Sequence, residues 1–178
     1  MRTKSRTPVT LLFTVALGAL TGAGACSAPP ASNGYVELSE QLKAPFENGD
    51  VAPAIGMKCG TLDCHGNIAR NMRIYSQYGL RMALNDTPGG MPITPFEVDA
   101  DYRSVSGLEP EIMDQVIADG GANPERLTLI RKARGTEHHK GGAVVQVGDP
   151  MDTCLTTWLT GSPNKDACDQ AAQPPAWQ

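Results

Sequence analysis

Two cysteines and a histidine within a short run are the feature that most constrains this chain. Cys59 and Cys64 are separated by four residues, and His65 follows the second cysteine directly. Two thiols followed at once by an imidazole is the order needed for covalent haem attachment, in which the thiols form thioethers and the histidine binds iron. The usual gap is shorter, so a Cys59–Cys64 disulfide and a Cys/His metal site with His138 or His139 stay open as alternatives.

The N-terminus has the pattern of an export signal. A basic start is followed by a short apolar stretch over residues 9–20 and then by Ala23-Gly24-Ala25-Cys26. This box resembles a bacterial lipoprotein signal, which implies that residues 1–25 are removed and that Cys26 carries the lipid. Cleavage by signal peptidase I at the same Ala-x-Ala sequence is the alternative, and both predict an exported protein. Ser27 after the lipidated cysteine favours the outer membrane over the inner membrane.

Removal of the signal makes the chain clearly acidic. Residues 26–178 contain 12 Lys and Arg against 19 Asp and Glu, a net charge of −7. Nucleic acid is therefore excluded as a partner, because its phosphates select clustered cations. About 150 residues suffice for one compact domain with a single core.

The remaining cysteines divide into separate tasks. With Cys26 assigned to the lipid and Cys59 with Cys64 forming a close pair, Cys154 and Cys168 are left near the C-terminus. Thiols in exported proteins are usually oxidised. We therefore predict a Cys154–Cys168 disulfide that ties the last helix to a C-terminal tail.

Apolar spacing predicts an all-α domain. One helix is expected over 51–57, with Asp50 as its N-cap and Pro53 in the first turn. A second begins at Pro110 and ends at Gly120, and Pro124 precedes a third apolar run.

The clearest helix lies near the end of the chain. Asp149 is expected to cap it, Pro150 takes its first position and Gly161 ends it. Apolar side chains follow the helical spacing i, i+4, i+7 and i+8 at Met151, Leu155, Trp158 and Leu159.

The segments between these helices are expected to be irregular. Residues 67–84 are partly amphipathic but interrupted by Gly79, and residues 86–107 contain enough proline and glycine to predict a long loop. Arg131 to Gly142 is expected to be a basic loop. The predicted organisation is a signal peptide (1–25), a lipidated tether (26–49), a helical domain (50–162) and a disulfide-tied tail (163–178).

Several short motifs resemble the cytochrome c superfamily, in particular its planctomycete-type domains. Cys64-His65-Gly66 is followed by Gly79-Leu80-Arg81, and Leu129-Ile130-Arg131-Lys132 precedes His139-Lys140-Gly141-Gly142 and a terminal helix with Trp158-Leu159. The resemblance covers roughly residues 51–161 and implies a small cytochrome c-like fold, in which the first and last helices pack across each other beside a covalently bound haem c. The four-residue gap between the cysteines departs from the usual pattern.

The resemblance also implies a set of ligands. Cys59 and Cys64 would carry the haem, His65 would bind its iron, and His139 is the first choice for the sixth ligand because its loop resembles that of the family. His138 and Met91 are the alternatives. The cations expected near the propionates are Arg131, Lys132, Arg134 and Lys140, which a solvated basic loop would explain equally well.

The expected function is electron transfer at the cell envelope. No nucleophile elbow, phosphate-binding loop or zinc-protease motif occurs, so an electron carrier is expected rather than an enzyme, although an open sixth position would permit a haem-based activity. Redox proteins of the envelope are the expected partners, with the membrane reached through the N-terminal lipid. The competing interpretation is a disulfide-stapled lipoprotein without haem that has a binding or structural role.

Overall fold

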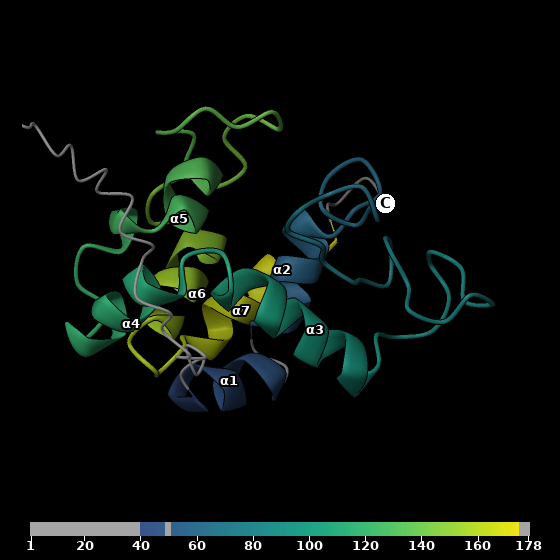
Figure 1. The fold of residues 1–178 in the computed structure, drawn as a ribbon, viewed down its shortest axis with the longest axis horizontal. Helices are drawn as coiled ribbons and strands as arrows, with labels where there is room; N and C mark the ends of the chain where they lie inside the picture. The colour runs from purple at the N-terminus through teal and green to yellow at the C-terminus, as the bar shows by residue number, and fades with distance from the viewer. Residues whose placement is uncertain (1–39, 49–50, 175–178) are drawn as a thin grey trace, which may run out of the picture. The chain divides into compact units, whose positions relative to one another are not determined.

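The protein is described by a computed structural model that covers residues 40–48 and 51–174. The signal peptide, Cys26 and the start of the tether lie outside the described residues, as does Asp50. The described part is all-α, as the sequence predicts, and its only β pairing is an isolated bridge between Tyr75 and Leu80 (Figure 1). None of its helices combines the length and the apolar character needed to cross a membrane. The elements in chain order are α1 (Glu40–Glu47), α2 (Ala52–Cys59), α3 (Pro95–Ser106), α4 (Pro110–Ala118), the 3₁₀ turn η1 (Pro124–Arg126), α5 (Thr128–Ala133), α6 (Pro150–Trp158) and α7 (Lys165–Ala171).

Helix α6 forms where the sequence predicts the last helix. Asp149 caps it by accepting a hydrogen bond from the backbone of Asp152 at 2.7 Å, and Pro150 occupies the first turn. All four apolar side chains predicted for its inner face are buried, each with at most 2% exposure. Helix α4 likewise begins at Pro110 and buries Met113 and Val116.

Helix α1 shows that the folded domain begins earlier than expected. Leu42 and Phe46, one helical turn apart, are completely buried. The Phe46 ring lies 5.5 Å from that of Tyr102 in α3 and 5.4 Å from that of Trp158 in α6. Trp158 Nε1 donates a hydrogen bond to the Leu42 carbonyl at 2.9 Å. The prediction that the tether extends to residue 49 is therefore wrong for residues 40–47, which belong to the core.

Helix α3 replaces most of the loop predicted over residues 86–107. Thr94 and Glu97 form a capping box, in which the Thr94 side chain accepts from the Glu97 backbone and the Glu97 carboxylate accepts from the Thr94 backbone. Pro95 sits in the first turn, where a missing backbone N–H costs nothing. The long-loop prediction was wrong because it treated this proline as a helix breaker rather than as a helix start.

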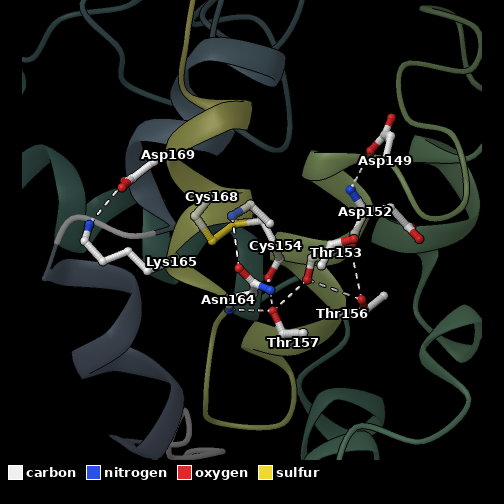
Figure 2. Close-up of a disulfide and its surroundings, with 11 residues drawn as sticks. Asp149, Asp152, Thr153, Cys154, Thr156, Thr157, Asn164, Lys165, Cys168 and Asp169 are labelled. Carbon is white, nitrogen blue, oxygen red and sulfur yellow. Dashed lines mark hydrogen bonds and ion pairs between the residues drawn. A yellow bond between two sulfur atoms is a disulfide. The ribbon is translucent and has the colours of Figure 1, made fainter.

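Helix α7 lies in the segment predicted to be a tail. Asn164 caps it by accepting from the backbone of Ala167 at 3.0 Å. Cys154 in the middle of α6 and Cys168 in the middle of α7 form a disulfide (Figure 2). The bond is therefore the expected pairing, but it joins two packed helices rather than a helix and an irregular tail.

The packing of α2 differs from the expectation that the first and last helices of the domain pack across each other. Its main helical neighbours are α7 and α3, whereas α6 packs mainly against α7 and α1. Helix α2 starts after Val51, which makes no side-chain cap, and continues to Cys59, two residues beyond the predicted end. The first cysteine of the motif thus lies on the last turn of α2, a helix that packs against α7.

Candidate functional site

The four-residue gap between the cysteines is a compact turn. After α2 ends, the backbone N–H of Cys64 donates to the Thr61 carbonyl at 3.0 Å. The N–H of His65 donates to the Cys59 carbonyl at 2.9 Å, which closes the loop and returns the histidine to the end of the helix. The longer gap therefore still brings Cys59 and His65 together.

Three glycines allow this turn to pack against the segment that follows it. A Cβ atom on Gly66 would lie 2.1 Å from the Gly60 carbonyl oxygen, and one on Gly79 would lie 1.8 Å from the same oxygen. Neither position admits a side chain without movement of the backbone. The Gly60 carbonyl also accepts a hydrogen bond from Ser76 Oγ at 2.5 Å. These contacts fix the motif against residues 76–79, and they explain why the amphipathic pattern seen over 67–84 does not form a helix.

His65 is held in the state that a metal ligand needs. Its ring is half-buried, and Nδ1 lies 2.9 Å from the Met72 carbonyl oxygen. Because a carbonyl only accepts, Nδ1 carries the proton and Nε2 keeps its lone pair in the neutral ring. Burial lowers the pKa of His65, and the nearby His139 and Arg70 lower it further, although the bond to Met72 raises it. The neutral imidazole is therefore favoured at neutral pH.

His139 meets His65 from the loop after α5. Its Nδ1 lies 3.0 Å from the Gly142 carbonyl oxygen, so in the neutral tautomer that makes this bond Nδ1 carries the hydrogen and Nε2 keeps its lone pair. The two ring centroids are 6.0 Å apart and the ring planes differ by 12°. Imidazoles that share one metal ion have centroids roughly 6 Å apart, because each metal–nitrogen bond is about 2.0–2.1 Å long. The centroid separation of the two rings is therefore close to that of two imidazoles on opposite sides of one metal ion.

Two adjoining cavities surround these rings. The first cavity has a mostly apolar lining, encloses about 230 Å³ and runs between the cysteine motif and α5. The second cavity encloses about 290 Å³ and extends toward Lys140 and Gly141. Both cavities are lined by Cys64, His65, Arg70 and His139. The facing histidines thus stand at the junction of two hollows, an arrangement that suits a broad, flat ligand held between them.

Both cysteines of the motif are free thiols that line the first cavity. Cys59 faces the cavity, and the protein around it desolvates the thiol, which together with the nearby Cys64 raises the pKa of Cys59 to about 12. No group of three or more His, Cys, Asp or Glu side chains in the described part of the chain is arranged to hold a metal ion.

The alternative ligands lie elsewhere. His138 is exposed and lines neither of these cavities, and its carbonyl accepts a hydrogen bond from Lys132 at 2.9 Å. Met91 is 70% exposed and is also absent from both linings. Of the three candidates for the sixth position, the structure brings only His139 to His65.

The four predicted cations separate into two pairs. Lys132 and Lys140 line the cavities, and Lys132 also forms an ion pair with Glu137 at 2.9 Å. Arg134 instead forms a two-pronged ion pair with Asp152, at 2.7 and 3.0 Å. Arg131 is directed at Glu137 and at carbonyls of η1. The two arginines are thus occupied in holding the fold.

Arg70 is a site residue that its position in the sequence did not indicate. Its Nε donates to the Cys64 carbonyl at 2.9 Å and a terminal nitrogen donates to the Asp63 carbonyl at 3.0 Å. The side chain therefore clamps the motif while its positive charge borders both cavities. Lys58, the residue before the first cysteine, also lines the first cavity.

Comparisons of the chain with protein-family models, with curated proteins and with solved structures find no match.

Proposed function

We propose that this protein binds a covalent haem between His65 and His139 and transfers electrons at the cell envelope. The observation that carries the proposal is the facing pair of rings, with centroids 6.0 Å apart and each Nδ1 bonded to a carbonyl. The free thiols of Cys59 and Cys64 at the edge of the same cavity support attachment through thioethers. Haem iron held by His65 and His139 would supply one-electron transfer.

The residues around the cavity have separable tasks in this proposal. Cys59 and Cys64 would form the thioethers, while Met72 and Gly142 orient the two ligands through their carbonyls. Apolar side chains would exclude water from the first cavity, and they include Met72, Leu108, Leu129 and Val144. The cations that border the cavities are placed to neutralise propionates, and they are Lys58, Arg70, Lys132 and Lys140.

The location of this activity follows from the N-terminal sequence. A lipid on Cys26 would anchor the domain to the envelope, and Ser27 favours the outer membrane. Redox proteins of the envelope would then be its partners. Metabolic labelling of the exported protein with a radioactive fatty acid, compared with Cys26→Ala, tests the anchor separately from the haem.

The haem is tested by producing the full chain together with a haem-attachment system. We expect a Soret band that survives denaturation and acid-acetone extraction, with the spectrum of low-spin iron. Correctly exported protein that lacks the band would refute haem binding and would favour the disulfide-stapled lipoprotein. A Cys64→Ala variant that keeps its haem through extraction would show that attachment does not need both thioethers.

Two adjacent histidines provide a matched pair of variants. His139→Ala is expected to lose the low-spin spectrum, whereas His138→Ala, at an exposed position one residue away, is expected to keep it. The reverse result would assign the sixth position to His138.

A further inference from the structure

The segment from Met72 to Met82 has no regular partner strand in the described part of the chain, and three of its backbone donors bond to side chains of α3. The N–H of Arg73 donates to Ser104 Oγ at 2.9 Å, that of Tyr75 to Asp101 Oδ1 at 2.6 Å, and that of Met82 to Glu97 Oε1 at 2.7 Å. The three acceptors are spaced i, i+4 and i+7 along α3 and so share one helix face. We call these three side chains the α3 acceptor row.

The same segment is bonded to His65 on its other edge. The Met72 carbonyl accepts from His65 Nδ1 at 2.9 Å, and the N–H of Ile74 donates to the His65 carbonyl at 2.9 Å. In an extended chain, alternate residues direct their backbone groups to opposite sides. Residues 73 and 75 therefore bond to α3, while residues 72 and 74 bond to His65. A slip of one residue would turn the Met72 carbonyl away from the histidine ring.

Asp101 occupies this row at a cost to stability. The residue is completely buried, and its Oδ2 atom has no hydrogen-bond partner. Burial raises the pKa of Asp101 to about 8, despite the opposing bond from Tyr75. A buried polar atom without a partner destabilises the folded state. The structural role of this side chain is to accept, through Oδ1, the hydrogen bond from the Tyr75 backbone N–H.

We propose that Asp101 and Ser104 are positioning residues for His65. They hold residues 73 and 75 in the register that places the Met72 carbonyl on His65 Nδ1, and this bond keeps the proton on Nδ1 and leaves Nε2 available as a ligand. The role as an iron ligand rests on the proposed function, but the orientation of the ring by α3 does not.

The exchange of the His65 Nδ1 proton with solvent, measured by NMR, tests the proposal. The full chain is used as purified, and it is reduced so that any low-spin iron is diamagnetic. Loss of an acceptor in Ser104→Ala or Asp101→Leu should accelerate exchange about threefold to tenfold, the range expected for weakening one hydrogen bond. Asp101→Asn keeps an oxygen acceptor and should leave the rate within about twofold of the original.

Two references make the result specific. Asp99→Asn changes a carboxylate on the same helix that pairs with Arg103 and Lys43 instead of with the segment, so it should not alter the exchange. The Nδ1 proton of His139, held by Gly142, should exchange at the same rate in every variant.

Unchanged exchange at His65 in folded Ser104→Ala and Asp101→Leu would overturn the proposal. If Asp101→Leu does not fold, Ser104→Ala alone decides. Failure of haem binding would appear separately, as the absence of an extraction-resistant Soret band, whatever the exchange rate.

Discussion

The two candidate ligands are held in opposite ways. His65 lies in a turn that is fixed by distant parts of the chain, namely the glycine contacts with residues 76–79 and the α3 acceptor row. His139 lies in a loop that is closed locally, since Val144 and Val145 donate to the Ala133 carbonyl at the end of α5 and the ring bonds only three residues ahead. His65 is thus held by contacts with distant parts of the chain, whereas His139 is held by contacts close to it in sequence.

The largest expected effects come from removing the imidazole rings of His65 and His139 one at a time. His65→Ala should lower the yield of haem-bound protein by roughly 100-fold, because even the outer partners of metal ligands contribute about 10–100-fold. His139→Ala should keep its haem, and added imidazole should restore its low-spin spectrum, because the His139 loop is partly exposed. Spectra recorded with and without imidazole check both results. Equal losses in the two variants would remove the asymmetry.

The second test uses pH, because α3 carries two buried carboxyl groups with opposite shifts. The raised pKa of Asp101, about 8, means that its contribution to stability is complete below about pH 3.8 and is lost as the pH rises through 8. The loss should be on the order of 3–5 kcal/mol across this window. Chemical unfolding of Asp101→Asn at several pH values should show that this slope is gone.

Glu97, one turn earlier, provides the control for this slope. Burial opposes ionisation of Glu97, but hydrogen bonds from Arg81, Thr94 and Met82 outweigh it and lower its pKa to about 2. Its contribution is therefore present above pH 4.5 and is lost as the pH falls toward 2. Glu97→Gln should flatten only this acid limb. A slope between pH 4 and 8 that persists in Asp101→Asn would exclude Asp101 as its source.

The third test removes the disulfide between α6 and α7, the second of which packs against α2. Replacement of Cys154 and Cys168 by alanine should lower the free energy of unfolding by about 3 kcal/mol, the value expected for a closed loop of this length. Because α7 packs against α2, the thermal midpoint should fall for the whole domain in a single transition. Differential scanning calorimetry measures it, with the reduced original chain as reference. Two separate transitions would show that the cysteine motif does not depend on the α6–α7 pair.

The smallest expected effects compare glycines from the two loops. Gly79→Ala places a Cβ against the Gly60 carbonyl and should cost about 2–3 kcal/mol, as overpacking does. Gly142→Ala meets open space and pays only for its φ of +73°, about 1 kcal/mol. Urea unfolding of the two variants gives the difference. A larger cost at Gly142 would mean that the His139 loop is the more constrained of the two.

The sequence predicted those parts of the fold that carry strong local signals. The cap at Asp149 with Pro150 and the apolar face up to Leu159 was enough for α6, and the pairing of Cys154 with Cys168 followed from elimination. Helix α1 was missed because two apolar residues in a polar segment are a weak signal until Tyr102 and Trp158 surround Phe46. That environment depends on tertiary contacts that no local pattern contains.

The candidate site was predicted in part for the same reason. The motif identified His65, and the glycine loop favoured His139 over His138 before any geometry was known. The support from α3 was missed once residues 86–107 were interpreted as a loop, although Thr94 and Glu97 have capping-box spacing. With that helix recognised, the acceptors at 97, 101 and 104 would have fallen on one face.

The bond between Trp158 and the Leu42 carbonyl has a mechanical consequence. If the chain is anchored at its N-terminus, any pull between the membrane and the domain enters through α1. The indole would then carry part of this force, because its hydrogen bond joins the first described helix to α6 across more than a hundred residues of chain. Tension on the anchor would be borne by the aromatic cluster of Phe46, Tyr102 and Trp158, which joins α1 to α3 and α6.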